Sequence, residues 1–354
     1  MAFTTIDDPS QYFTITLWTG NATDDRAITN SANAGDFQPD WIWYKERDGT
    51  SEHRVFDSSR GASKRLEPNN TNAEATDTSN HKSFDSNGFT IGTSGSTNEN
   101  GKTYVAWQWK ANGGSTTSFN ESGSNPGGTH QANTTAGFSI VTYTGTGSNG
   151  TVQHGLSSAP ELVIVKQRDD AAHDWQTGSD ELSSWAYRLK LNDNVSQASV
   201  ATSFNSTAPT SSVFTVGSND DVNEDAHGYV GYCFHSVQGY CKVGAWKGNG
   251  SANGPYIYTG FRPKWILHKD LGSTEQWQIK DTTRYPNNPN YYPIYANLSN
   301  VEGNNTNSSV DFLSNGFKIR TSDGSHNTSG NTYLYYAIAE QPWCSSKGVP
   351  SNAR

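Results

Sequence analysis

Three stretches of the chain open alike and decide the fold: FTITLWTG at 13–20, FSIVTYTG at 138–145 and CKVGAWKG at 241–248. One aromatic residue aligns in each stretch, with spacings of 125 and then 103 residues: Trp18, Tyr143 and Trp246. Equal spacings in separate parts of a chain are the sign of an internal repeat. We therefore compared the three segments block by block.

Three further blocks recur in the same order behind each opening. They are PDWIWYK, PELVIVK and PKWILHK from Pro39, Pro160 and Pro263; FDSNGFTIG, TSSVFTVG and FLSNGFKIR from Phe84, Thr210 and Phe312; and YVAWQWK, YVGYCFH and YLYYAIA from Tyr104, Tyr229 and Tyr333. The sequence thus predicts three copies of one domain. The predicted boundaries are 1–111, 138–239 and 240–343, with a linker at 112–137 and a tail at 344–354.

The excess length of the first spacing lies in residues 112–137. This stretch is rich in Gly, Ser, Thr and Asn, a composition typical of flexible linkers or long surface loops. Copies two and three instead follow each other closely. The pattern predicts a mobile first domain and a rigid pair formed by the second and third.

Each copy has the pattern of short strands separated by tight turns. The block at 104–110 alternates as a strand with one buried face does, and Asn-Gly pairs at 87–88, 100–101 and 315–316 favour hairpin turns. We expect an all-β protein of three tandem antiparallel β-sandwich domains, in which the first and last blocks of each copy lie close together. Trp41, Trp265, Trp107 and Trp109 are expected in the core, the last two against the opposing sheet.

Composition excludes several classes of protein. Ser, Thr and Asn make up 113 of 354 residues, but 11 Trp, 17 Tyr and 14 Phe and a net charge of only −9 oppose disorder. Without an apolar run of 18 residues or large Lys/Arg clusters, neither membrane insertion nor nucleic-acid binding is expected. Cys233, Cys241 and Cys344 fit no metal-site spacing; Cys233 and Cys241 are either bridged or buried free thiols.

Two motifs suggest a family. The patterns FDSNGFTIG at 84–92 and NGKTYVAWQWK at 100–110, with AEQPW at 339–343 near the end, resemble a domain of unknown function found in tandem in virion proteins of marine tailed phages. That domain is similar in outline to the concanavalin-like and laminin-G jelly rolls. The resemblance implies a place on the outside of a virion, and it implies no catalytic or ligand residues.

Two groups of carboxylates were considered for catalysis or metal binding. Glu46 and Asp48 have the spacing of a glycosidase pair, but a Gly-Thr turn follows them directly. Asp169, Asp170 and Asp174 surround His173, which suggests either a metal or catalytic site or a solvated turn. We expect the protein to be non-enzymatic, with no catalytic residues.

An acidic loop is the candidate metal site. Asp221, Asn223 and Asp225 alternate in the way that begins a calcium loop, although Ala226 and Tyr232 stand where the full pattern has Gly and Glu. The alternatives are Ca²⁺ binding and a charged hairpin loop. No other cofactor is expected.

The candidate ligand-binding segment is YPNNPNYYP at 285–293. Tyr rings stack on sugar faces, Asn amides can bond to hydroxyls, and Pro stiffens the loop. The residues proposed to contact a sugar or a protein are Tyr285, Asn287, Asn288, Tyr291 and Tyr292. An ordinary surface loop is the third alternative.

The sequence therefore predicts a virion structural protein, with modules strung outward from the external surface of a phage particle. Tail fibre, tail-associated adhesin and capsid decoration all fit. The alternative is a lectin-like receptor-binding protein that contacts host surface glycan. Expected partners are other virion proteins and further copies of the chain.

Overall fold

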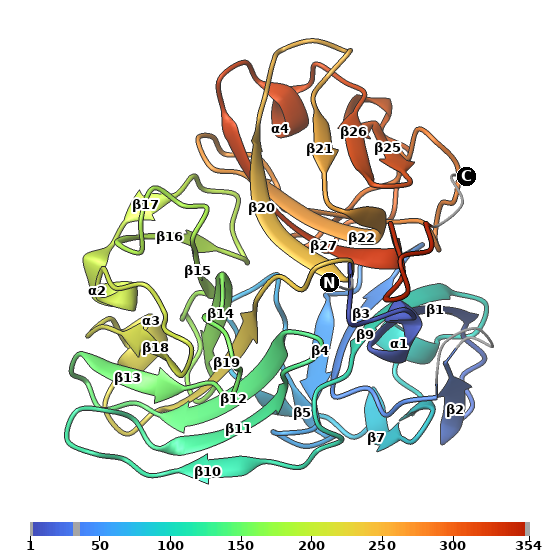
Figure 1. The fold of residues 1–354 in the computed structure, drawn as a ribbon. Coiled ribbons are helices and arrows are strands. Elements are labelled where there is room, and N and C mark those ends of the chain that lie inside the picture. Colours follow the sequence, from blue (N-terminus) through green and yellow to red (C-terminus); the bar gives the residue numbers. More distant parts are fainter. Residues whose placement is uncertain (1–2, 31–35, 351–354) are drawn as a thin grey trace.

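The computed structural model describes residues 3–30 and 36–350, and it is built almost entirely of antiparallel strands. The chain folds as three segments, which we number 1 (up to residue 111), 2 (112–239) and 3 (240–343). Figure 1 shows them as three lobes around a common centre: blue to cyan for segment 1, green to yellow for segment 2 and orange to red for segment 3. The all-β prediction is confirmed.

In segment 1 the described residues form, besides the 3-10 helix at Pro9–Gln11, the elements β1 (Phe13–Thr19), β2 (Arg26–Thr29), β3 (Trp41–Glu46), β4 (Arg54–Asp57), β5 (Lys64–Arg65), β6 (Ala75–Thr76), β7 (His81–Asp85), β8 (Gly88–Ile91), α1 (Gly95–Asn98) and β9 (Thr103–Trp109). Segment 2 has β10 (Thr117–Phe119), β11 (Gly128–Asn133), β12 (Phe138–Thr144), β13 (Gly150–Gln153), β14 (Leu162–Gln167), β15 (Gln176–Ser179), β16 (Tyr187–Lys190), β17 (Ala198–Ser199), α2 (Ala201–Phe204), β18 (Val213–Val216), α3 (Asp220–Asn223) and β19 (Gly228–Phe234). Segment 3 has β20 (Cys241–Lys247), β21 (Tyr256–Tyr258), β22 (Phe261–Asp270), β23 (Gln278–Asp281), β24 (Ile294–Tyr295), a 3-10 turn (Thr306–Ser308), β25 (Val310–Leu313), β26 (Gly316–Ile319), α4 (Gly324–Asn327) and β27 (Thr332–Pro342).

Each segment contributes the same principal sheet. The strand orders are β1-β9-β3-β4 in segment 1, β12-β19-β14-β15 within the larger sheet of segment 2, and β20-β27-β22-β23 in segment 3. The first and last strands of each segment are therefore neighbours, as predicted. A smaller sheet covers one face of each: β2-β8-β7, β13-β18 and β21-β26-β25. Apolar side chains fill the space between the two sheets of each segment.

The aligned aromatic residues occupy the same environment in all three segments. Trp18, Tyr143 and Trp246 lie opposite Tyr104, Tyr229 and Tyr333 in the register of the first and last strands. The two rings of each pair are stacked, with centroids 5.4, 5.0 and 5.0 Å apart. Each first-strand ring also donates a hydrogen bond to a carbonyl of the adjacent short helix. The repeat predicted from sequence is thus a repeat of packing.

A buried asparagine in the short helix before the last strand of each segment is a second repeated feature. Asn98, Asn223 and Asn327 each donate to two or more backbone carbonyls and accept from a backbone N–H at the end of the first strand. A buried amide is stable only when it is hydrogen-bonded in this way. These side chains therefore fasten the turn after the first strand to the helix before the last strand.

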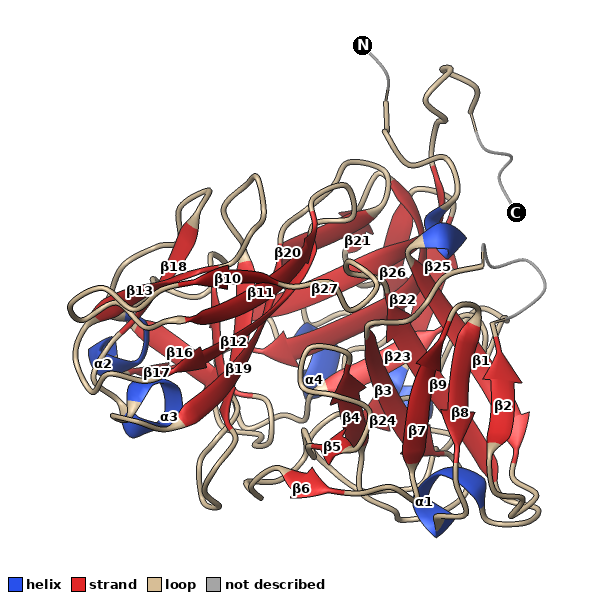
Figure 2. Ribbon diagram, turned by 90° about the horizontal axis from the view of Figure 1, so that it is seen from below, coloured by secondary structure: helices blue, strands red, loops and turns tan. Residues whose placement is uncertain are grey.

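The largest apolar cluster lies between the segments and includes residues from all three. Trp41 stacks on Phe138 and Tyr232 of segment 2, while Trp109 meets the edge of Trp265 in segment 3. These tryptophans are buried as predicted, but against other segments. Modules strung outward and a mobile first domain do not agree with this shared core. Figure 2 shows the three principal sheets gathered around it.

Residues 112–137 are not a flexible linker. They contain β10 and β11, which extend the principal sheet of segment 2, because β11 pairs with β12 and β10 pairs with β11. The amide of Gln131 donates to Ser58 and Ser59 of segment 1, which fixes this hairpin to its neighbour. The polar composition of residues 112–137 wrongly indicated a linker, because a polar strand at a sheet edge needs few apolar residues.

Cys233 and Cys241 are buried free thiols, and Cys344 is also free. Burial raises the pKa of the Cys233 thiol to about 12. In the C-terminal tail, Ser346 bonds to Asp7 near the other end of the chain. The rest of the predicted tail, 351–354, lies outside the described residues.

Candidate functional site

At each contact between two segments, a loop of one segment donates a hydrogen bond to a strand end of the other. The three contacts close into a ring. Segment 2 contacts segment 1, segment 1 contacts segment 3, and segment 3 contacts segment 2 through the same backbone hydrogen bond. The three bonds run from Glu74 N to Arg168 O (2.7 Å), from Glu302 N to Arg47 O (2.7 Å) and from Gln197 N to Leu271 O (3.0 Å). Each donor comes from a loop and each acceptor from the end of a buried strand.

A second bond at each contact comes from the residue before the fourth strand. Trp175 donates its indole N–H to the carbonyl of Glu67 (3.0 Å), and Trp277 donates to that of Lys190 (2.9 Å). In segment 1 the equivalent residue is His53, whose Nε2 lies 3.1 Å from the carbonyl oxygens of both Tyr295 and Leu298. These bonds join the same three pairs of segments as the first set, but with the donor and acceptor segments exchanged.

A chain of buried charges lies at the contact of segments 1 and 2. Arg60 pairs with Asp57 at 2.5 Å and with Glu74 at 2.9 Å, and Glu74 also pairs with Arg168. Tyr232 of segment 2 donates to Asp57 at 2.7 Å. Burial by itself would lower the pKa of Arg60, but the negative groups around it, Asp57 first, outweigh burial and raise that pKa.

The contact of segments 1 and 3 repeats this chain. Arg284 pairs with Asp281 at 2.5 Å and with Glu302 at 3.1 Å, and Glu302 pairs with Arg47. Trp107 takes the place of Tyr232 and donates to Asp281 at 3.1 Å. The repeated motifs DSSR at 57–60 and DTTR at 281–284 were the sequence signal for these charges, and our sequence analysis missed it.

The contact of segments 2 and 3 uses uncharged residues at the same positions. Ser179 and Leu182 replace the aspartate and arginine, and Leu271 replaces the second arginine. Leu182 and Leu271 belong to the shared apolar cluster. The contact of segments 2 and 3 therefore differs in chemistry from the other two contacts of the ring.

A groove of about 350 Å³ opens on the outer side of the contact between segments 1 and 3. It is lined by Arg47, Asp48, Thr103, Arg284, Tyr285, Tyr292 and Glu302. Two residues of the predicted tyrosine segment thus face charged residues contributed by both segments. The arrangement offers aromatic faces, an arginine and carboxylates to one ligand.

The tyrosine segment folds as a compact cluster of rings. The centroids of Tyr285 and Tyr292 are 4.5 Å apart, and Tyr291 lies within 5.2 Å of both. The hydroxyl of Tyr285 donates to that of Tyr291 at 3.0 Å. This packing holds the rings in place before any ligand arrives, which lowers the entropic cost of binding.

The two asparagines of the predicted site lie apart from this groove. Asn287 and Asn288 line a second hollow with Arg262, Pro286 and Glu340. Asn288 exchanges two hydrogen bonds with the backbone of Phe312, so its amide shapes the loop. The structure therefore divides the five predicted residues between two surfaces.

The predicted calcium residues do not converge on one point. Asp221 accepts from the backbone N–H of Asp174 and from the amide of Gln176. Asn223 is buried and bonded to the backbone, as described above, while Asp225 is exposed. The structural hydrogen bonds of Asn223 explain why an asparagine stands at this position. The loop therefore lacks the middle ligand of the expected calcium set.

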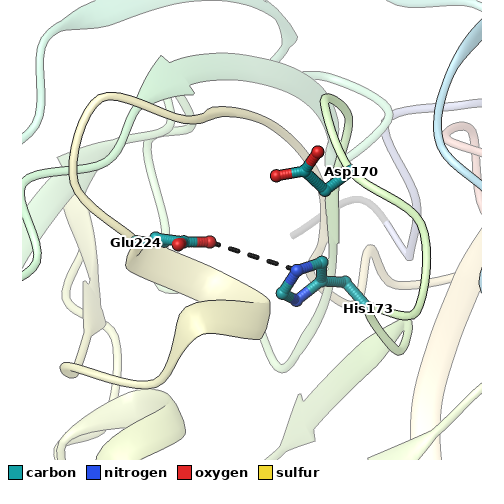
Figure 3. A group of neighbouring side chains, drawn as sticks. All are labelled: Asp170, His173 and Glu224. Atoms are coloured by element: carbon teal, nitrogen blue, oxygen red, sulfur yellow. Dashed lines mark ion pairs between the residues drawn. The ribbon is translucent and has the colours of Figure 1, made fainter.

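A different group near that loop holds possible metal ligands. Asp170, His173 and Glu224 each place a ligand atom within 4.8 Å of the other two. Figure 3 shows these three side chains. The sequence places Asp170 near His173 but gives no sign of Glu224, which comes from the turn after α3. Only folding brings that turn next to the loop between β14 and β15.

The glycosidase candidates Glu46 and Asp48 have other partners. Glu46 is buried and accepts from the backbone N–H of Ser51, with Lys102 3.7 Å away. Asp48 accepts from the backbone N–H of Thr103 at the edge of the groove. These two carboxylates therefore have separate positions, one interior and one at the surface.

Residues 8–342 match the family described as a domain of unknown function (DUF7483), and the chain belongs to that family. The match runs through all three segments. No curated protein matches the chain. Among the helices of the described residues, none is long and apolar enough to cross a membrane.

Proposed function

For this member of the family, we propose a non-enzymatic structural role in a virion, on the external surface of a phage particle. Each segment would be a small sandwich of the jelly-roll type, similar to concanavalin and laminin-G domains. The tail fibre, a tail-associated adhesin and a capsid decoration are the candidate positions. Other virion proteins and further copies of the chain are the proposed partners.

The closed ring of three alike segments is the observation that carries this proposal. Backbone hydrogen bonds and a common apolar core join the segments, so that a single chain makes a compact block. A compact block with a surface rich in Ser, Thr and Asn is suited to display on a particle. The resemblance of the sequence motifs to virion proteins supplies the biological setting.

Mass spectrometry of gradient-purified particles tests this role. We expect peptides of the chain to remain with the particles at a constant ratio to a known coat protein through successive gradients. Immunogold labelling would then distinguish a tail position from a capsid position. Absence of the chain from purified particles would contradict the proposal.

Carbohydrate binding in the groove between segments 1 and 3 is the second candidate function. The packed rings of Tyr285 and Tyr292 give a surface on which a sugar ring can stack, and Arg47, Asp48 and Thr103 supply polar groups beside it. Such a site combines an apolar platform with a few orienting polar groups, as ligand sites usually do. A glycan of the host surface would be the ligand.

A glycan array followed by calorimetry tests this second function. Tyr285→Ala and Tyr292→Ala should each weaken binding at least about tenfold, which corresponds to a loss of about 1.4 kcal/mol. Tyr258→Ala is the matched control, because Tyr258 is exposed on a different sheet. Equal binding by all three variants, or no glycan bound by the native chain, would exclude the groove as a sugar site.

A further inference from the structure

Two loops of segment 2 bring together two imidazoles and two carboxylates. Asp170 and His173 lie in the loop between β14 and β15, while Glu224 and His227 lie between α3 and β19. Figure 3 shows Asp170, His173 and Glu224 pointing into one space between these loops. All four side chains are at least partly exposed, so an ion could reach them from solvent.

The distances fit a first coordination shell with little movement. The ligand atoms of Asp170, His173 and Glu224 lie within 4.8 Å of one another. His173 Nε2 is 4.0 Å from Glu224 Oε2, and His227 Nε2 is 3.0 Å from Asp170 Oδ2. Donors about 2.0–2.2 Å from a tetrahedral zinc ion are roughly 3.3 Å apart, so the ligand atoms of Asp170, His173 and Glu224 need to close by up to about 1.5 Å.

The outer nitrogens of both imidazoles have hydrogen-bond acceptors. His227 Nδ1 lies 2.9 Å from the carbonyl oxygen of Asp225, and His173 Nδ1 lies 3.2 Å from a carboxylate oxygen of Asp221. A carbonyl oxygen only accepts, so Nδ1 of His227 carries a proton and the lone pair of the neutral ring is on Nε2. Histidines that bind metals are held in this way, by an acceptor for the other ring N–H.

The other two segments lack the two histidines at these places, although segment 1 keeps the glutamate. Segment 1 has Ser51, Glu99 and Lys102 where segment 2 has His173, Glu224 and His227, and the Lys102 ammonium points at Glu46 there. Segment 3 has Glu275, Thr328 and Asn331.

The loop between β14 and β15 is also one residue longer than its counterparts. Ala172 in this loop has a φ of +73° and donates its N–H to the carbonyl of Thr71 in segment 1. That bond fixes the loop so that Asp170 and His173 face α3. The ligand set is therefore a feature of segment 2, placed by an insertion that the other copies lack.

We propose that Asp170, His173, Glu224 and His227 bind one divalent transition-metal ion, with Zn²⁺ as the first candidate. Two imidazoles favour Zn²⁺, Ni²⁺ or Cu²⁺ over Ca²⁺, which prefers oxygen ligands. Asp221 then orients His173 from outside the coordination shell. The bound ion would tie the β14–β15 loop to the turn after α3 and so stabilise segment 2.

Isothermal titration of the metal-stripped full chain with ZnCl₂ tests this site. We expect one ion per chain and a rise in melting temperature, because a ligand that binds only the folded state stabilises it. His173→Gln and His227→Gln should each weaken binding at least about tenfold, about 1.4 kcal/mol. His130→Gln, a partly buried histidine elsewhere in segment 2, is the matched control.

Two further measurements keep the result clear. Circular dichroism of each variant checks that it folds, and the visible spectrum of the Co²⁺-loaded chain reports directly on nitrogen and oxygen ligation. Loss of the Co²⁺ band in His173→Gln with native folding supports the site. No Zn²⁺ binding at 1 mM, equal binding by His173→Gln and the native chain, or binding of Ca²⁺ in preference to Zn²⁺ would overturn it.

Discussion

The contacts that segment 1 makes with segments 2 and 3 differ in chemistry from the contact between segments 2 and 3. The first two contain an Asp–Arg–Glu–Arg chain whose Asp and first Arg are buried, whereas the third has Ser179, Leu182, Gln197 and Leu271 at the corresponding places. The backbone bond from the loop to the strand end is nevertheless present in all three. Similar geometry thus accommodates either charged or apolar side chains.

This difference separates the backbone hydrogen bonds, which position the segments, from the side chains, which only fill the contact. Removing charges from water is costly, and a buried ion pair repays that cost only with good geometry and further hydrogen bonds. The two charged contacts meet this condition, since Tyr232 and Trp107 donate to their aspartates. The apolar contact reaches a similar arrangement without any of these charges.

Breaking one charge chain should have the largest effect. Arg60→Leu leaves the buried Asp57 without its cation and Glu74 with Arg168 alone, so the free energy of unfolding should fall by about 3–5 kcal/mol. Urea unfolding monitored by tryptophan fluorescence measures this loss. Lys82→Leu, which removes an exposed ion pair with Asp24, should leave stability nearly unchanged. Equal effects of the two substitutions would show that the buried chain has no special role.

Acid should weaken the contact of segments 1 and 3, where His53 replaces the tryptophan of the other contacts. Burial holds the pKa of His53 well below its ordinary value, and Nδ1 accepts from the indole N–H of Trp43 at 2.7 Å. Below pH 6.5 the unfolded chain therefore binds more protons than the folded chain. The free energy of unfolding should therefore decrease as the pH drops below 6.5, by up to about 1.4 kcal/mol per pH unit for each such histidine.

The buried His81 and His268, with pKa values of about 3, add to the same slope. His53→Gln should make the decrease between pH 6.5 and 5 shallower without abolishing it, as measured by urea unfolding at several pH values. An unchanged slope in that variant would place the acid sensitivity elsewhere.

Exchanging one contact for the other should have the smallest net effect. A chain with Asp57→Ser, Arg60→Leu, Glu74→Gln and Arg168→Leu has the residues of the apolar contact in place of the charged one. We expect its stability to lie within about 2 kcal/mol of the native chain, because replacing a whole buried ion group is often neutral or better. A loss as large as that of Arg60→Leu alone would show that the charges are needed to position segments 1 and 2.

Local patterns predicted much of the fold but not its assembly. The spacing of Trp18, Tyr143 and Trp246 correctly predicted matched strands, because a strand side chain meets the residue opposite it in the register. The same reasoning predicted that Trp107 and Trp109 are buried, but against their own second sheet. Both faces of each principal sheet are covered, and periodicity does not say which partner covers which face.

The candidate sites show the same limit. The tyrosine segment was visible as a local composition, but Arg47, Asp48 and Thr103 reach it from segment 1. Likewise, His173 was noticed beside its sequence neighbours, whereas Glu224 and His227 come from a turn some fifty residues away. Sites shared between distant loops leave no fixed spacing in a sequence.

The sequence by itself determined that one strand pattern occurs three times, that its aromatic residues are buried and that first and last strands of each copy are neighbours. These properties depend on local periodicity and on turns, which each copy carries within itself. Only the tertiary structure decided that the copies close into a ring, that residues 112–137 join a sheet and which charges become buried. Those outcomes depend on which surfaces meet, and burial of the same apolar area can be satisfied by more than one arrangement of segments.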